Sequence, residues 1–181
     1  IVDVWYSEIG HNIRKKKKKK KKKKREKWNE RKAITWKKLK ILLAGSYGKV
    51  YLTAPVESST LSALAAVKSA DACHSSALLE EGLYLSELRG HPNIIQCFGH
   101  DISTENGEDV YNLLLEYAAG APFMNHDLIN KNKGTIPESL VACYTFITLK
   151  GLSAIQEVNI VHRDIKPGNI LVYPSGDHEN N

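Results

Sequence analysis

Alternating apolar and polar positions predict strands in the part of the chain that begins at Trp36. Residues 36–56, WKKLKILLAGSYGKVYLTAPV, predict a strand, a glycine turn and a second strand. The small apolar side chains of residues 63–70, ALAAVKSA, predict a third strand. This part of the chain therefore begins as three consecutive strands.

A helix and two more strands are expected next. Residues 75–90 carry leucines at near-helical spacing, and the glycine at the end of that segment stops the helix. The segments NIIQCFGHDIS, 93–103, and VYNLLLEYA, 110–118, predict two strands. The polar segment TENGED, 104–109, predicts the turn between them. The predicted order is strand, strand, strand, helix, strand, strand.

The second half of the chain reads as helical. Residues 121–132 predict a short helix, and residues 137–159 predict a long one with Pro137 at its first position and Glu138 in its first turn. A short strand is expected at 170–173. The apolar face predicted for the long helix consists of Leu140, Val141, Tyr144, Ile147, Leu152, Ile155 and Val158.

Charge is distributed unevenly along the 181 residues. Residues 1–40 contain 18 Lys and Arg against 4 Asp and Glu, whereas residues 41–181 contain 8 against 16. A basic tail, 1–35, therefore precedes a mildly acidic body, and a hydrophobic content of 42% is enough for that body to bury a core.

The basic tail contains a tract of twelve consecutive basic residues, Arg14–Arg25. Like charges repel, so the tract is expected to be disordered or a frayed helix. Nuclear import and nucleic-acid binding through phosphate neutralisation are two functional interpretations. The sequence favours a solvated tail or a translated repeat without a role, because a homopolymer carries no geometric information.

Cysteine content and hydropathy indicate the compartment. Cys73, Cys97 and Cys143 are odd in number and far apart, so neither a zinc site nor a disulfide framework is expected. A reducing compartment fits this pattern, which predicts the cytoplasm, or the nucleus if the basic tract directs import. No apolar run approaches the roughly 20 residues of a membrane span. The chain starts without Met or a signal peptide, which indicates a fragment or an incomplete gene sequence.

Two glycines between the first two predicted strands form a candidate phosphate-binding turn. Gly45 and Gly48 would let backbone N–H groups close over phosphate oxygens, with Val50 beneath an adenine ring. Taken alone, this pattern is more often an ordinary hairpin.

Lys68 is the candidate phosphate ligand of the third strand. A lysine on the inner face of a sheet is unfavourable unless it is paired. Glu80 and Glu81 on the following helix are candidate partners, and we favour Glu81. Such an ion pair would orient the ammonium toward the α- and β-phosphates of a nucleotide. The alternative is a lysine on the outer face, which is more common for a single Lys.

The segment HRDIKPGN, 162–169, carries the densest chemistry. Asp164 could accept a proton from a substrate hydroxyl, and Lys166 could neutralise charge on a transferring phosphate. Asn169 offers a carbonyl oxygen to Mg²⁺, while His162 and Arg163 would shape the loop. An ordinary polar loop does not account for this spacing.

Together these motifs resemble a eukaryotic protein kinase, with H-R-D-x-K-x-x-N, the glycine turn, A-V-K and a helix glutamate in the expected order. The lysine two residues after the aspartate resembles serine/threonine kinases. The run from AVKSA to LLLEYA is similar to plant mitogen-activated protein kinase kinase kinases. The resemblance covers roughly residues 36–181.

The resemblance implies an α+β, bilobal kinase-like fold, with a complete β-rich N-lobe carrying one helix and the first part of a helical C-lobe. The N-lobe would span about 36–117 and the incomplete C-lobe about 118–181. The ligands would be ATP and Mg²⁺, and the substrate a protein hydroxyl, for example on a MAP kinase kinase.

The resemblance also implies roles for further residues. Leu115 matches the gatekeeper, Glu116 would offer a carbonyl to the adenine amino group, and Ala118 would offer backbone N–H and C=O groups. The purine would lie between four apolar side chains: Leu42, Val50, Ala66 and Leu171.

Three departures from the family pattern are visible. Leu43 replaces the first glycine of G-x-G-x-x-G, which is expected to weaken the grip on ATP. Gly82 lies beside Glu81 in the predicted helix, where glycine costs about 0.5–1 kcal/mol relative to alanine. The sequence reaches Asn181 without a D-F-G segment, so very slow or no transfer is expected of this chain alone. Without the rest of the C-lobe, the apolar face of the 137–159 helix is also expected to have nothing to bury it, and such exposed apolar area favours aggregation.

Three functions therefore compete. The first is an ATP-dependent serine/threonine kinase of which this chain is a fragment. The second is a non-catalytic truncated kinase that binds a nucleotide or a partner. The third is a nucleic-acid binder acting through the lysine tract, ranked last because no aromatic or base-reading motif accompanies the charge.

Overall fold

The computed structural model describes residues 35–45, 48–56, 63–119 and 135–173. The described residues form two compact units, one containing 35–86 and 97–117 and the other containing 87–96 and 118–173. The predicted basic tail up to residue 34 and the predicted helix at 121–132 lie outside the described residues.

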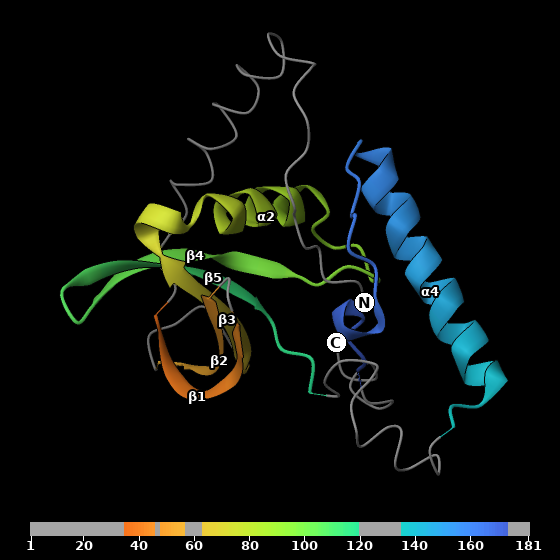
Figure 1. The fold of residues 1–181 in the computed structure, drawn as a ribbon, viewed down its shortest axis with the longest axis horizontal. Helices are drawn as coiled ribbons and strands as arrows, with labels where there is room; N and C mark the ends of the chain where they lie inside the picture. Colours follow the sequence, from red (N-terminus) through yellow and green to blue (C-terminus); the bar gives the residue numbers. More distant parts are fainter. Residues whose placement is uncertain (1–34, 46–47, 57–62, 120–134, 174–181) are drawn as a thin grey trace, which may run out of the picture. The chain divides into compact units, whose positions relative to one another are not determined.

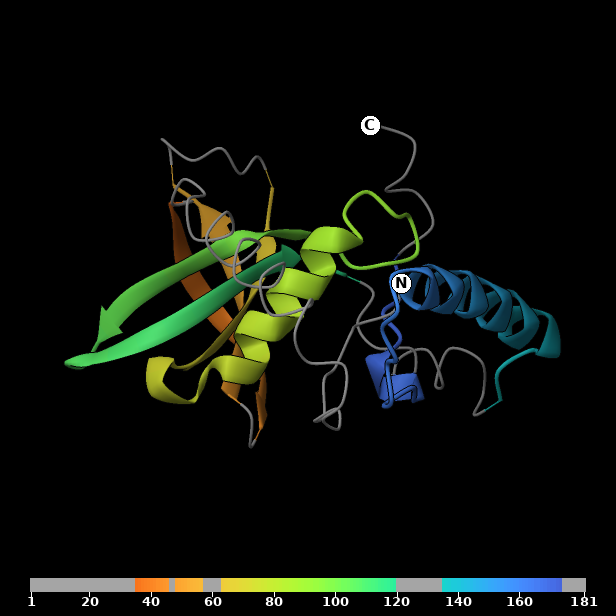
Figure 2. The ribbon, with the colours of Figure 1, turned by 90° about the horizontal axis from the view of Figure 1, so that it is seen from above.

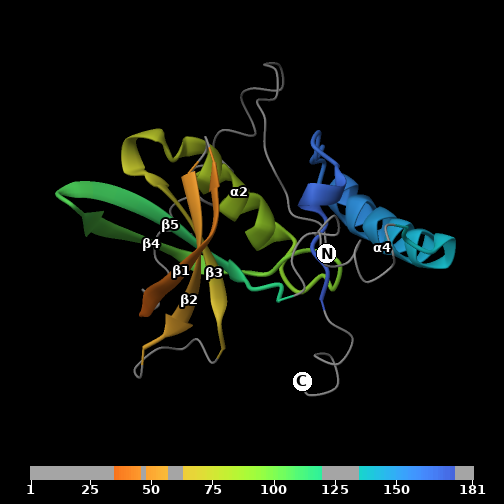
Figure 3. The same ribbon diagram turned by 60° about the horizontal axis from the view of Figure 1, so that its bottom comes forward.

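The first unit contains a five-stranded antiparallel sheet in the order β1-β2-β3-β5-β4. Figure 1 shows the strands, and Figure 3 shows β1, β2 and β3 side by side. The predicted order of strands is confirmed. Their bounds are β1 Trp36–Gly45, β2 Gly48–Pro55, β3 Ala65–Asp71, β4 Cys97–Glu105 and β5 Glu108–Glu116.

Helix α2, Ser76–Glu87, follows a short 3-10 helix, η1, Ala72–His74, and lies beside the sheet (Figures 1 and 2). Leu85 lies one turn after Glu81, and both side chains are buried. Residues four apart share one face of a helix. Because Glu81 shares this face with Leu85, the packing of the leucines in the interior also buries the Glu81 side chain.

The register of the sheet determines which side chains share a face. Val50, Lys68 and Leu113 lie opposite one another across β2, β3 and β5. Leu52, Ala66 and Leu115 form the next row on the same face, because side chains two residues apart in a strand point the same way. We refer to this as the α2 face, because Lys68 on it is paired with α2.

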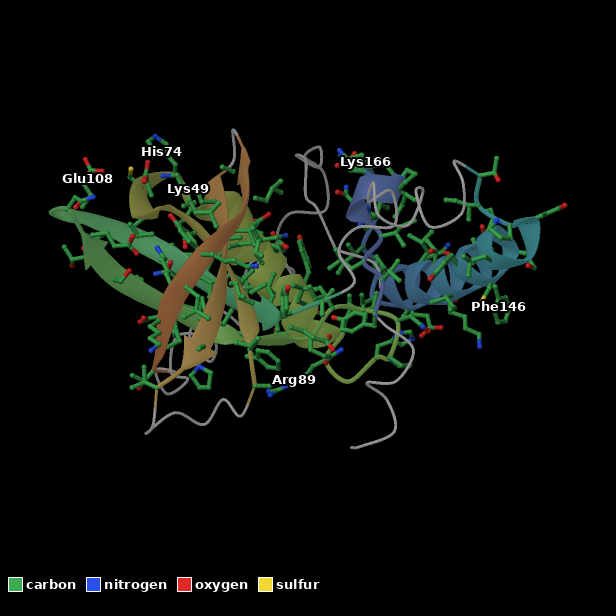
Figure 4. All side chains as sticks on the ribbon, turned by 90° about the horizontal axis from the view of Figure 1, so that it is seen from below. Lys49, His74, Arg89, Glu108, Phe146 and Lys166 are labelled. Carbon is green, nitrogen blue, oxygen red and sulfur yellow. The ribbon has the colours of Figure 1, made fainter. Side chains whose placement is uncertain are left out.

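The turn between β4 and β5 is shorter than predicted. The ladder continues through Thr104 with Asp109 and through Glu105 with Glu108, so the predicted turn at 104–109 was too long. Asn106 and Gly107 alone make the turn, with φ angles of 53° and 85°. Asn-Gly is the preferred pair for such left-handed hairpin turns. Figure 4 shows Glu108 at this end of the hairpin.

The second unit is built around helix α4, Glu138–Glu157, with a 3-10 helix, η2, at Pro167–Asn169. Pro137 lies at the N-cap and not at the first helical position, since its φ and ψ are −55° and 137°. Its carbonyl accepts the N–H groups of Leu140 and Val141. The predicted helix was therefore right in kind and slightly too long.

The buried stripe of α4 differs from the predicted apolar face. Its buried residues are Thr148, Gly151, Ala154 and Ile155, of which only Ile155 was predicted. Small residues contribute little to a hydropathy pattern, but they allow close packing. Two large apolar side chains, Phe146 and Leu149, are 59% and 57% exposed, and Figure 4 shows Phe146 projecting from α4.

The strand predicted at 170–173 is wrong. Only Ile170 and Leu171 form isolated bridges. The N–H of Ile170 donates to the carbonyl of Pro167 at 3.2 Å. The 3-10 turn therefore uses a backbone N–H that strand pairing would need. Within the described ranges, the helices are too short or too polar to cross a membrane.

Candidate functional site

Lys68 and Glu81 form a buried ion pair in the first unit. Lys68 Nζ donates to Glu81 Oε1 at 2.6 Å, and the two side chains are 10% and 7% exposed. Buried charges are unfavourable unless they are paired, so each residue makes the other tolerable at this position. The structure therefore pairs Lys68 with Glu81, the favoured one of the two candidate glutamates, and the alternative of an outward-facing lysine is wrong.

The residues predicted to contact a purine divide between the two units. Val50, Ala66 and Leu115 share the α2 face with Lys68. Leu42 lies at a register shift in β1, between Ile41 and Leu43. Leu171 lies in the second unit, where it is half-buried. Glu116 ends β5, and Ala118 lies just after it. The nucleotide-binding roles of these residues stay predictions.

The two glycines that close the β1–β2 hairpin differ in their surroundings. Gly45 pairs with Gly48 across the hairpin. Gly48 has φ +123°, and a Cβ there would collide with the carbonyl oxygen of Ser69. A Cβ on Gly45 would meet no atom within 4 Å. Of these two glycines, the fold therefore requires only Gly48.

This difference predicts opposite effects for two matched substitutions. We expect Gly48→Ala to lower the free energy of unfolding by about 3 kcal/mol, because it combines an unfavourable φ with a steric clash. We expect Gly45→Ala to leave stability unchanged within about 1 kcal/mol. Urea unfolding of the two variants would test this, and equal losses would contradict it.

The loop that carries Asp164 has one side chain turned inward. His162 is buried, and its Nδ1 accepts the backbone N–H of Asp164 at 3.3 Å. Arg163 between them is exposed and has φ +67°, a left-handed conformation that is unfavourable for a bulky residue. The buried imidazole thus contacts the loop backbone at Asp164, and the loop-shaping role of His162 and Arg163 stays a prediction.

One oxygen of Asp164 receives two side-chain donors. Lys166 Nζ and Asn169 Nδ2 both donate to Asp164 Oδ2 at 2.9 Å. The hydrogen bond from Lys166 is the main reason why the pKa of Asp164 lies below its usual value of 3.8, and the Asn169 bond adds to the effect. Asp164 is therefore ionised at neutral pH. Both donors use Oδ2, so Oδ1 is the oxygen suited to accept a further hydrogen bond.

Asn169 is held so that its amide nitrogen faces Asp164. Its Nδ2 also donates to the backbone oxygen of Asp164 at 2.8 Å, and the side chain is buried. Its carbonyl oxygen is then left for a hard cation such as Mg²⁺, which prefers oxygen ligands. Among the described residues no group of three or more His, Cys, Asp or Glu could hold a metal ion.

The structure thus brings the predicted residues together in two sets. Lys68 and Glu81 meet in the first unit, whereas Asp164, Lys166 and Asn169 meet in the second. The first set offers an ammonium that could hold a phosphate. The second set offers a carboxylate that could accept a proton.

Comparison with known proteins identifies the family. The protein kinase domain matches residues 36–178. The chain therefore belongs to the protein kinase family, as the sequence motifs had predicted.

The chain resembles mitogen-activated protein kinase kinase kinases of plants and yeast. It is 41% identical over 114 residues to mitogen-activated protein kinase kinase kinase 20 of Arabidopsis thaliana, a match covering 63% of this chain and 33% of the relative. It is 37% identical over 147 residues to mitogen-activated protein kinase kinase kinase 3 of the same plant, covering 79% and 23%. Serine/threonine-protein kinase SSK22 of Saccharomyces cerevisiae is 30% identical over 146 residues, covering 77% and 10%. The chain thus matches a third or less of the length of these relatives.

Proposed function

We propose that the chain carries the nucleotide-binding and catalytic-loop segments of a serine/threonine protein kinase acting in a MAP kinase cascade. The observation that carries this proposal is the ionised Asp164, with one oxygen held by Lys166 and Asn169 and the other available. The serine/threonine type rests on Lys166, two residues after the aspartate. The place in a cascade rests on the similarity to the kinases named above, and a MAP kinase kinase is the proposed substrate.

The proposed reaction transfers the γ-phosphoryl group of ATP to a protein hydroxyl. ATP would supply the phosphoryl group, and Mg²⁺, when bound, would neutralise charge on its phosphates. Asp164 Oδ1 accepts the hydroxyl hydrogen and orients the oxygen, which forms the new bond to phosphorus as the bond to the ADP oxygen breaks. The proton passes to the carboxylate.

The other residues would bind the nucleotide and neutralise the charge of its phosphates. Lys166 places positive charge beside Asp164, where negative charge develops on the transferring group. Lys68, fixed by Glu81, would hold the α- and β-phosphates, and Asn169 would contribute one oxygen to Mg²⁺. The apolar side chains of Val50, Ala66 and Leu115 on the α2 face would receive the purine, with Leu42 and Leu171 as further contacts. The backbone of Glu116 and Ala118 would hydrogen-bond the adenine.

A second candidate is a kinase relative that binds nucleotide without transferring phosphate. One observation favours it: Leu43, at the position of the first family glycine, lies opposite Val50 and is 58% exposed. The 181 residues contain no D-F-G segment, which carries a magnesium ligand in kinases; this bears on the activity of the 181-residue polypeptide and not on the choice between the two candidates. We expect this polypeptide by itself to bind MgATP and to transfer phosphate very slowly or not at all.

Two measurements test these proposals. The first is the affinity of the purified chain for MgATP, by isothermal titration calorimetry, with Lys68→Met as the control. The second is transfer from radiolabelled ATP to a MAP kinase kinase by the longest product of the gene that contains residues 36–178. Binding with transfer supports the kinase, and binding without transfer in the longest product supports the second candidate. Absence of binding would overturn both.

A further inference from the structure

Asn112 is a buried amide in the middle of an apolar strand. It lies in β5 between Tyr111 and Leu113, and its exposed fraction is 0%. A buried amide costs free energy unless its oxygen and nitrogen are both hydrogen-bonded. The hydrogen-bond partners of Asn112 therefore indicate its structural role.

Both ends of the Asn112 side chain are bonded to hydroxyl groups of neighbouring strands. Ser69 Oγ in β3 donates to Asn112 Oδ1 at 2.6 Å. Asn112 Nδ2 donates to Ser103 Oγ in β4 at 2.9 Å and to the backbone oxygen of Val110 at 3.2 Å. The side chain thus links β3, β5 and β4, the three strands on one side of the sheet.

The chain of donors continues to a carboxylate. Ser103 Oγ donates to Glu105 Oε1 at 3.0 Å, and Lys38 Nζ in β1 donates to the same oxygen. The hydrogen bond from Lys38 is the main reason why the pKa of Glu105 is lowered, so this end is charged at neutral pH. From Ser69 onward each hydroxyl or amide donates in the same direction, an arrangement in which the bonds reinforce one another.

The first member of this chain, Ser69, is adjacent to Lys68. Successive side chains in a strand point to opposite faces, so Ser69 points away from the α2 face when Lys68 points toward it. The pairing of Ser69 with Asn112 and of Lys68 with Leu113 in one register shows this alternation. A bond that holds Ser69 to its side of the sheet therefore fixes the rotation of β3 at Lys68.

We propose that Asn112, acting through Ser69, is a positioning residue for Lys68, an inference that rests on the proposed role of Lys68 in holding phosphate. Lys68 is then held twice. Glu81 restrains its ammonium from α2, and Asn112 restrains its backbone from within the sheet. The second restraint does not depend on α2.

Ser69→Ala tests this proposal, because it removes only the hydroxyl that joins β3 to Asn112. Thr53→Val is the matched control: Thr53 is fully buried in the same sheet, its hydroxyl donates to the Ala65 carbonyl at 3.1 Å, and it is not adjacent to Lys68. We expect both variants to lower the melting temperature by similar amounts. Only Ser69→Ala should weaken MgATP binding, by about fivefold, which corresponds to one hydrogen bond.

The affinities are measured by titration calorimetry well below both melting temperatures, so that every variant is folded. Ser69→Thr retains the hydroxyl and should retain the wild-type affinity. The NMR chemical shift of the Lys68 side chain should move in Ser69→Ala and not in Thr53→Val. Equal affinities in Ser69→Ala and the wild type would overturn the inference and leave the proposed function standing. A wild-type chain that does not bind MgATP would instead overturn the proposed function.

Discussion

Replacement of Lys68 by methionine is expected to lower the free energy of unfolding by about 3–5 kcal/mol and to remove MgATP binding. The loss of stability follows from burial: Glu81 would keep its charge in the interior without the ammonium that now lies 2.6 Å away. Methionine has a length similar to that of lysine and carries no charge, so the substitution leaves the packing of the α2 face largely intact.

A double variant separates stability from nucleotide binding. In Lys68→Met with Glu81→Leu, both buried charges are replaced by apolar groups, which is often neutral or stabilising. We expect this variant to regain most of the stability lost in the single variant. It should still fail to bind MgATP, because the phosphates would lack the ammonium.

Urea unfolding and titration calorimetry on the wild type, the single variant and the double variant provide the test. Glu80→Gln is the control, since Glu80 is the neighbouring carboxylate on α2, whereas the 2.6 Å ion pair of Lys68 is with Glu81. It should cost less than about 1 kcal/mol. A double variant as unstable as the single one would refute the buried-charge explanation. Nucleotide binding by the single variant would refute the role of Lys68.

The sequence was sufficient to predict the order of strands because the strands and their turns are local features. The glycines at 45 and 48 and the apolar runs around Val67 and Leu114 are visible without knowledge of the fold. It was insufficient for the long helix, where the buried stripe runs through Gly151 and Ala154. Burial of such small residues depends on what approaches the helix, and hydropathy does not encode that.

The sequence likewise predicted only part of the candidate site. The spacing of Asp164, Lys166 and Asn169 identified the loop, but spacing does not show that both donors bond the same carboxylate oxygen. Lys68 could have faced either side of the sheet, because a strand has two faces and sequence alternation alone does not assign them. Asn112 was missed, although an amide inside the apolar run YNLLLE is a visible irregularity.

Replacement of Asp164 by asparagine is expected to lower the rate of phosphoryl transfer by about 10²–10⁴-fold while leaving MgATP affinity nearly unchanged. A positioned general base contributes that much, and an asparagine of the same shape retains the hydrogen bonds of the loop but cannot take up a proton. The rate is measured in the longest product of the gene that transfers phosphate. A variant that loses affinity in parallel with rate would indicate a binding role instead.

The ionisation of Asp164, which its role as a base requires, can be tested separately in the 181-residue chain. The Lys166 hydrogen bond lowers the pKa below 3.8, so the carboxylate is already ionised at pH values where an unpaired aspartate begins to take up protons. Lys166→Met should therefore raise the pKa of Asp164 toward its usual value, and carbon NMR of the carboxyl group would follow the titration. In an active product the same variant should move the acid limb of the pH–rate profile to higher pH, because the ionised form is the base. A pKa that does not change in Lys166→Met would show that the lysine does not control the ionisation of Asp164.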